Sequence, residues 1–150
     1  GLFDVRLKRN QDDEFHYRAR SKGLKIYQNS DIKLWYYPRD TFRGLVKQYY
    51  QYGLYKPMVL RKIKSGFKIR HIVPSIFIVY MIVALLMVNT FPIVFLPFLL
   101  DALLIGISIV KSKIGFKAKF RVPLAFLGVH LGYGCGFLLG IFRSRFHYIR

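Results

Sequence analysis

The stretch IVPSIFIVYMIVALLMVNTFPIVFLPFLLDALLIGISIV, residues 72–110, decides the fold of this chain. Nearly every side chain in it is apolar, and Asp101 is its one charged residue. The polar pair Asn89-Thr90 divides it into two segments, 72–89 and 91–110. At about 1.5 Å per helical residue, each segment is long enough to cross roughly 30 Å of hydrocarbon. The sequence therefore predicts two membrane helices here.

The two flanks of this stretch are strongly basic. A cluster from Lys64 to His71 precedes it, and a second cluster follows it at Lys111, Lys113, Lys117, Lys119 and Arg121. The link between the segments carries no charge. Because short cytoplasmic loops are enriched in Lys and Arg, we expect a hairpin with both ends in the cytoplasm.

A third hydrophobic segment covers residues 122–142. Glycine recurs in it every fourth position, the small-xxx-small pattern that lets two helices approach closely, at Gly128, Gly132, Gly136 and Gly140. Arginines follow at 143, 145 and 150, and they would lie outside the cell if the segment spanned the membrane. Spanning and re-entrant arrangements both stay open. Residues 71–150 are thus expected to form an α-helical membrane region of two to three hydrophobic segments.

The overall composition favours a membrane partner over nucleic acid. The formal net charge is +18, yet 53% of the residues are hydrophobic. Basic clusters beside long apolar runs are typical of loops attracted to anionic lipid, so membrane lipids are expected partners and nucleic acid is not. The single cysteine, Cys135, excludes a disulfide within the chain, and the four histidines show no metal-ligand spacing.

Residues 1–40 have the pattern of soluble α/β structure. Asp12, Asp13 and Glu14 begin a short helix, where acids complement the helix dipole, and Gly23 is placed to end it. Residues 24–28 and 32–37 are predicted strands, the second ending at Pro38. Trp35 is interpreted as a residue that packs within this second strand, the alternative being a platform on which a sugar ring stacks.

Residues 41–70 are predicted to contain an amphipathic helix and a basic linker. Asp40 or Thr41 can cap a helix that runs to about Gly53. One face is apolar, at Phe42, Leu45, Val46 and Tyr49, and another carries Gln48, Gln51, Tyr52 and Tyr55. This helix either lies on the membrane surface or packs on its own domain.

Two polar side chains within the apolar segments are further candidates. Asp101 is costly in hydrocarbon and marks either a functional site or a pairing with a neighbouring helix or interface. His130 is placed to hydrogen-bond between helices.

Several motifs occur in an order that resembles the acceptor-side region of glycosyltransferase family 2. They begin with Gly1-Leu2-Phe3-Asp4 and Asn10-Gln11-Asp12-Asp13-Glu14-Phe15, then Arg18 and Gly23. Ile26-Tyr27, Tyr36-Tyr37-Pro38-Arg39 and the run from Gly44 to Gly53 follow, and His130 to Phe137 end the series. The order is similar to that of membrane-bound members that build exopolysaccharides, the succinoglycan-synthesis type.

This resemblance implies an inverting transfer from a nucleotide-sugar donor to a lipid-linked saccharide or polysaccharide acceptor. It implies a GT-A-type catalytic domain of which residues 1–40 form the C-terminal part. Asp12 then matches the general base that deprotonates the acceptor hydroxyl, with Asp13 as the alternative one residue away. Glu14 and Arg18 match supporting residues. The implied location is the bacterial inner membrane, multi-pass, with the catalytic part in the cytoplasm.

The resemblance also has departures. Processive relatives carry a Gln-x-x-Arg-Trp motif on an interfacial helix, and here the matching residues are Gln48, Gln51 and Tyr52. These side chains still suit acceptor binding, but their identity favours single addition. No Asp-x-Asp motif occurs, so the divalent metal (Mg²⁺ or Mn²⁺) expected in the full-length enzyme has no ligands in this sequence.

The half of the family's catalytic domain that binds the nucleotide-sugar and carries the Asp-x-Asp motif has no counterpart in this sequence. We therefore expect the sequence to be the C-terminal portion of a longer enzyme and to be inactive alone. The alternative class is a small non-enzymatic basic membrane protein that acts as an anchor or recruits a partner. In that case the three acids are only a helix start.

Overall fold

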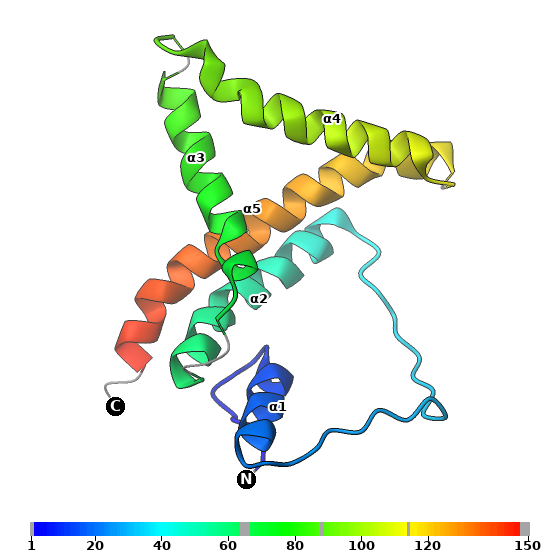
Figure 1. The fold of residues 1–150 in the computed structure, drawn as a ribbon, viewed down its shortest axis with the longest axis vertical. Helices are drawn as coiled ribbons and strands as arrows, with labels where there is room; N and C mark the ends of the chain where they lie inside the picture. Colours follow the sequence, from blue (N-terminus) through cyan, green and yellow to red (C-terminus); the bar gives the residue numbers. More distant parts are fainter. Residues whose placement is uncertain (1, 64–66, 88, 114, 148–150) are drawn as a thin grey trace.

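The computed structural model describes residues 2–63, 67–87, 89–113 and 115–147, and the regular secondary structure of these residues is helical. Lys64 of the predicted basic linker lies outside the described residues. Five α-helices follow one another, with 3-10 turns at Ile69–His71 and Pro92–Phe95 (Figure 1). The helices are α1 (Gln11–Ser21), α2 (Phe42–Lys62), α3 (Val73–Met87), α4 (Leu96–Lys111) and α5 (Phe116–His147).

The predicted α/β fold of residues 1–40, and with it the C-terminal end of a GT-A-type domain, is wrong. Residues 24–28 and 32–37 form no strands and belong to a long loop that runs away from the helices (Figure 1). Every residue from 24 to 40 is exposed, and Trp35, expected to pack within a strand, is 91% exposed. Aromatic and β-branched residues favour strands only where neighbouring strands and a hydrophobic face receive them. No second extended segment pairs with these residues in the described part of the chain.

Helix α1 begins and ends where the sequence indicates. Its first turn carries Asp12, Asp13 and Glu14. Gly23, just beyond its end, has φ of +75°, a backbone conformation that glycine adopts without steric cost, and its N–H donates to the carbonyl of Arg20 at 2.9 Å.

Helix α2 starts as predicted but is longer. The hydroxyl of Thr41 accepts a hydrogen bond from the N–H of Gly44 at 3.1 Å, which confirms Thr41 as the N-cap. The helix then continues through Gly53 and Pro57 to Lys62. A Cβ at Gly53 would overlap the carbonyl of Tyr133, so this glycine marks a close approach to α5 and not a helix end.

The glycines of the third hydrophobic segment face α2 along its length. A Cβ at Gly128 would lie 2.7 Å from the Phe42 ring, and one at Gly132 would lie 2.8 Å from the carbonyl oxygen of Val46. Cβ atoms at Gly136 and Gly140 would overlap backbone atoms of α2 further on. The predicted close helix approach is confirmed, and the partner is α2. Two interpretations were open for the amphipathic helix, and the structure shows the one in which it packs against its own chain, because α2 lies against α5.

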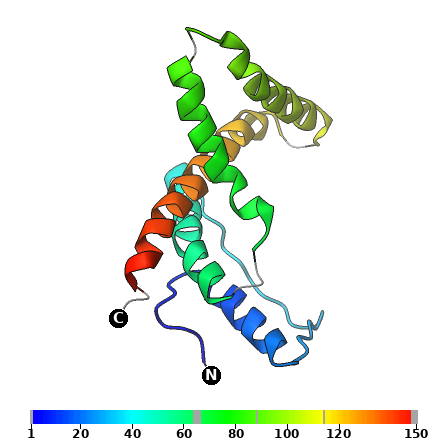
Figure 2. The same cartoon turned by 60° about the vertical axis from the view of Figure 1, so that its left-hand side comes forward.

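Helix α3 packs across α5, and α4 diverges from the end of α3 and runs back toward the start of α5 (Figures 1 and 2). Helix α3 crosses α5 at Gly134, whose carbonyl accepts a hydrogen bond from the Ser75 hydroxyl at 3.4 Å. The Tyr80 hydroxyl donates to the carbonyl of Val94 and ties the 3-10 turn back to α3. Among the described residues, Pro92–Lys111 and Ala118–Arg143 are apolar and long enough to cross a membrane, and none of the first stretch is buried inside the protein. Helix α3, with 15 residues, is shorter than the predicted segment 72–89 and is not among these candidate spans.

Candidate functional site

The acidic motif lies at the end of α1 that is held against the polar face of α2. Asn10 Nδ2 donates to the carbonyl of Tyr52, and Arg9 Nε donates to Oε1 of Gln51, both at 3.0 Å. One turn further along α2, Lys56 Nζ lies 2.6 Å from Oδ2 of Asp13. These contacts hold the start of α1 against the middle of α2.

The three consecutive acids occupy three different environments. Glu14 is buried, with 1% of its surface exposed. Asp13 is intermediate in exposure and is paired with Lys56. Asp12 is exposed, and its carboxylate makes no hydrogen bond or ion pair with any residue that the structure describes. Asp12 is therefore the exposed and unpaired acid of this motif within the described part of the chain.

Glu14 is the centre of a network of charges between α1 and α2. Its Oε1 lies 3.0 Å from Nε of Arg18 and 2.8 Å from Nζ of Lys62, which also lies 2.9 Å from Oδ2 of Asp4. Burial alone would raise the pKa of Glu14, but the hydrogen bonds from Arg18 and Lys62 outweigh it and lower the pKa. The Glu14–Lys62 pair joins α1 to the end of α2, whereas the Glu14–Arg18 pair lies within α1.

Asp4 and Lys62 complete this network and were not among the predicted site residues. The hydrogen bond from Arg6, followed by that from Lys62 acting against burial, holds the pKa of Asp4 well below its usual range. Asp4 belongs to the Gly-Leu-Phe-Asp run already noted, so a signal for it existed. No sequence signal distinguishes Lys62, because it is one of several basic residues that follow one another closely in the sequence.

A polar groove of about 420 Å³ runs beside the first half of α2. Its lining includes Gln48 and Gln51, two of the predicted acceptor-binding residues, together with Arg9, Arg39 and Lys47. The third such residue, Tyr52, is not in the lining but orients Gln48, whose Nε2 donates to the Tyr52 hydroxyl at 2.9 Å. Asp12 does not line this groove.

A second cavity brings together the two polar candidates of the apolar segments. Asp101 and His130 both line a space of about 340 Å³ between α3, α4 and α5, with Phe77, Phe98 and Phe126 among its other walls. His130 Nδ1 lies 2.9 Å from the carbonyl of Phe126 in its own helix. The hydrogen bond expected between helices is therefore made within α5 instead.

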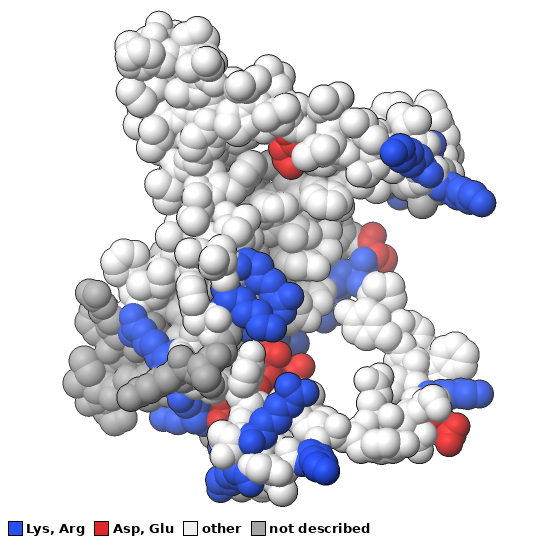
Figure 3. Space-filling view, in the orientation of Figure 1, with Lys and Arg blue, Asp and Glu red and all other residues white. Residues whose placement is uncertain are grey.

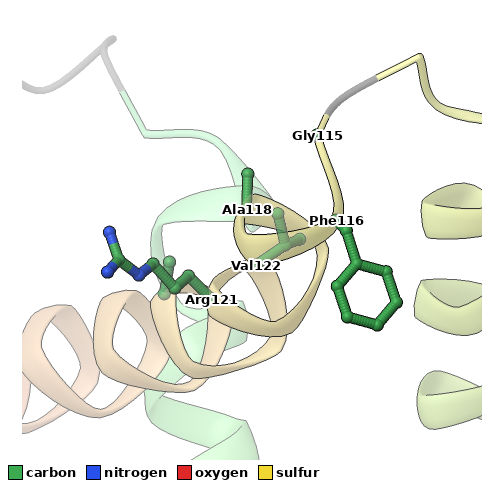
Figure 4. Close-up of a pocket in the computed structure, with 6 residues that line it drawn as sticks. Gly115, Phe116, Ala118, Arg121 and Val122 are labelled. Carbon is green, nitrogen blue, oxygen red and sulfur yellow. The ribbon is translucent and has the colours of Figure 1, made fainter.

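A third hollow, of about 680 Å³, lies at the start of α5. Gly115, Phe116, Ala118, Arg121 and Val122 contribute to it, and Phe116 and Arg121 point in different directions (Figure 4). Its walls come from one short stretch of chain and carry a single charged side chain, so they converge on no common point. Across the described residues, no three His, Cys, Asp or Glu side chains group as metal ligands would.

A segment of 61 residues, 41% of this chain, is 36% identical to a dolichyl N-acetyl-α-D-glucosaminyl phosphate 3-β-D-2,3-diacetamido-2,3-dideoxy-β-D-glucuronosyltransferase from Methanococcus voltae. The matched segment spans about a fifth of that protein, 19% of its length. No protein-family model and no solved structure matches the chain. The chain is thus similar in part to a glycosyltransferase, the broad class that its motifs resemble.

Proposed function

We propose that this chain is the acceptor-side and membrane part of a glycosyltransferase. It transfers a sugar from a nucleotide-sugar to a lipid-linked saccharide, with inversion, as a member of family 2 of the exopolysaccharide-building type. The observation that carries the proposal is the similarity to a transferase whose name specifies a lipid phosphate acceptor. The motif order around Asp12 and the exposure of its carboxylate support it.

In this proposal each member of the acidic motif has a separate task. Asp12 accepts the proton of the acceptor hydroxyl as that oxygen attacks the anomeric carbon, and the bond from this carbon to the nucleotide's phosphate oxygen breaks. Asp13 is a poorer base because Lys56 already binds its carboxylate. Glu14 and Arg18 hold α1 in place. Gln48 and Gln51 bind acceptor hydroxyls in the polar groove, where Arg9 and Lys47 suit an anionic group.

The membrane arrangement follows from the contact between α2 and α5. If α5 crossed the bilayer, α2 beside it would carry Lys47 and Lys56 into hydrocarbon, at roughly 3 kcal/mol for each charge on insertion scales. We therefore infer that α5 lies along the membrane surface, with the α3–α4 hairpin inserted above it and α1 and α2 on the cytoplasmic side. The hairpin surface is free of charge apart from Asp101 over most of its length, whereas the charges gather on α1 and α2 and at the cytoplasmic end of α4 (Figure 3).

Asp12→Asn tests the proposed chemistry in the protein expressed from its complete reading frame. Sugar transfer to a lipid-linked saccharide should fall by about 10²- to 10⁴-fold, the usual contribution of a positioned base. Nucleotide-sugar binding and membrane insertion should be unchanged. Asp31→Asn, in the exposed loop, is the matched control and should keep full activity.

Two outcomes would contradict the assignment. Activity of Asp12→Asn within about twofold of the unmodified protein would remove the base role from Asp12. Loss of activity in Asp13→Asn alone would move the role by one residue.

The alternative of a non-enzymatic basic membrane protein has one specific observation in its favour. Two of the three acids, Asp13 and Glu14, are ion-paired to α2 and so have structural tasks. Absence of sugar transfer by the unmodified protein across nucleotide-sugar donors, with membrane binding intact, would favour that alternative.

A further inference from the structure

The cavity of about 340 Å³ between α3, α4 and α5 has two polar side chains in an otherwise apolar lining. These are Asp101 of α4 and His130 of α5, and the other residues that contribute to the lining are apolar or glycine. None of the described residues in the lining is Lys or Arg, and neither residue type occurs in the sequence from 72 to 110. The cavity therefore has a carboxylate and no basic side chain.

The charge of Asp101 is not compensated within the described part of the chain. Its carboxylate makes no hydrogen bond or ion pair with a described residue, and so it has no such contact with His130. Asp101 belongs to Pro92–Lys111, the apolar stretch of which nothing is buried inside the protein. A carboxylate in apolar surroundings is costly unless it is paired with a cation or accepts hydrogen bonds. The cavity therefore favours a ligand that supplies such a partner.

His130 contributes an acceptor to the cavity and not a donor. Its Nδ1 lies 2.9 Å from the carbonyl oxygen of Phe126. A carbonyl oxygen can only accept, so Nδ1 carries the hydrogen, and Nε2 of the neutral ring is then an acceptor. No described residue donates to Nε2. The side chains of the lining thus include the Asp101 carboxylate and His130 Nε2 as acceptors, and they include no donor.

Aromatic rings form a connected group around this cavity. The ring centroids of Phe77 and His130 lie 5.4 Å apart, and those of Phe77 and Phe98 lie 5.6 Å apart. Phe126 stacks on His130 with 6.3 Å between the centroids. All of these residues line the cavity. Because the faces of aromatic rings carry partial negative charge, they favour a cation, as the carboxylate does.

These features distinguish between classes of ligand. An anion would meet the carboxylate and no basic side chain. A metal ion needs more ligands than one carboxylate and one imidazole, and the rest of the lining offers no side-chain oxygen, nitrogen or sulfur. A neutral alcohol leaves the charge of Asp101 uncompensated. A trimethylammonium group has the positive charge but no N–H, whereas a primary ammonium group has the charge and three N–H donors.

We propose that this cavity binds a primary ammonium group, which donates to the Asp101 carboxylate and to His130 Nε2. The aromatic rings surround the charge and the carbon atoms next to it. The volume lies at the small end of the range for ligand sites, about 300–1,000 Å³, and suits a headgroup better than an oligosaccharide. The site is independent of the proposed sugar transfer, because its residues lie outside the acidic motif and the polar groove.

Photolabelling tests the site without an activity assay. The protein is expressed from its complete reading frame, purified in amine-free detergent, and exposed to a short alkyl diazirine that carries a primary amine. The probe should label residues of the cavity, and n-butylammonium should compete. Butyltrimethylammonium and n-butanol should compete at least about tenfold less well, because the first lacks N–H donors and the second lacks the charge. Equal competition by butyltrimethylammonium or by n-butanol would overturn the proposal.

Two substitutions assign the two polar contacts. Asp101→Asn removes the charge with little change of shape and should weaken competition by n-butylammonium at least about tenfold. His130→Phe keeps an aromatic ring without the acceptor and should reduce the preference for n-butylammonium over butyltrimethylammonium. A histidine that only supports the fold would leave that preference unchanged. Asp31→Asn, in the exposed loop, is the matched control and should bind the amine as the unmodified protein does.

A primary ammonium group occurs in the headgroup of an ethanolamine phospholipid and in free alkylamines, and vesicles distinguish these sources. In phosphatidylcholine vesicles, competition by added phosphatidylethanolamine would identify the lipid headgroup. Competition by n-butylammonium without competition by phosphatidylethanolamine would identify a free amine. Labelling of the cavity that is unchanged in Asp101→Asn would reject the site for both sources. The competition series on the unmodified protein decides the proposal even where a substitution lowers stability.

Discussion

Glu14 is the residue on which the position of the acidic motif depends. Its carboxylate is buried and binds Arg18 and Lys62, so it joins α1 to the end of α2. Removing one partner of a buried ion pair leaves the other charge without compensation, which costs about 3–5 kcal/mol of stability. The other polar contacts of this junction are the Asp13–Lys56 pair and the hydrogen bonds from Arg9 and Asn10, and Asp12 moves with α1.

The lowered pKa values of Asp4 and Glu14 make this junction dependent on pH. Because both folded-state values lie below the ordinary 3.8 and 4.5, the stabilisation is complete above about pH 4.5. It is lost as the pH falls through the lowered values. Glu14→Gln should therefore lower the protection of the α1 amides from hydrogen exchange at pH 7. It should also make the further loss of protection in acid smaller than in the unmodified protein. Asp31→Asn should leave the exchange profile unchanged, and an identical profile for Glu14→Gln would exclude this role.

At the scale of elements, the glycines of α5 show how much of the fold the sequence predicts. Their four-residue spacing predicts a close helix contact, and the structure has it. The partner could not be predicted, because α2 reads as amphipathic and its Gly53 and Pro57 read as a helix end. Packing against α5 outweighs these local preferences. Ending α2 at Gly53 would remove contacts with α5 that stabilise the protein more than a glycine and a proline inside the helix destabilise it. The loop at residues 24–40 is the opposite case: strong strand propensity without a neighbouring strand gives no strand.

The candidate site was predictable to a similar degree. The acidic motif was singled out by its resemblance to glycosyltransferase family 2, and the Gln48 face by residue types and spacing. The structure brings the two regions together at the α1–α2 junction, while their catalytic and binding roles stay predictions. Which of the acids is free could not be predicted, because it depends on Lys56 and Lys62 of a distant segment.

The α2–α5 contact is tested by one added methyl group. Gly136→Ala places a Cβ against the carbonyl oxygen of Tyr50 and should destabilise the protein by about 1–3 kcal/mol, the usual cost of overpacking. Gly106→Ala, on α4, meets no atom within 4 Å and should be neutral or stabilising by up to about 1 kcal/mol. Thermal unfolding in detergent measures both. Equal effects of the two substitutions would mean that α5 does not approach α2 closely.

For the whole molecule, the decisive question is the side of the membrane on which each end of α5 lies. An α5 that spans would place Arg143 outside, whereas an α5 along the surface keeps it with Ser112 in the cytoplasm. Single cysteines introduced as Ser112→Cys, Thr90→Cys and Arg143→Cys in a Cys135→Ala background distinguish the two arrangements. With an impermeant thiol reagent added from outside intact cells, positions 112 and 143 should stay unlabelled, and position 90, at the tip of the hairpin, should react. In inside-out vesicles the pattern should reverse, because α2 cannot follow α5 through hydrocarbon with its lysines charged. Labelling of position 143 from outside would show that α5 spans and that its contact with α2 is broken in the membrane. Labelling of positions 90 and 112 from the same side would refute the hairpin itself.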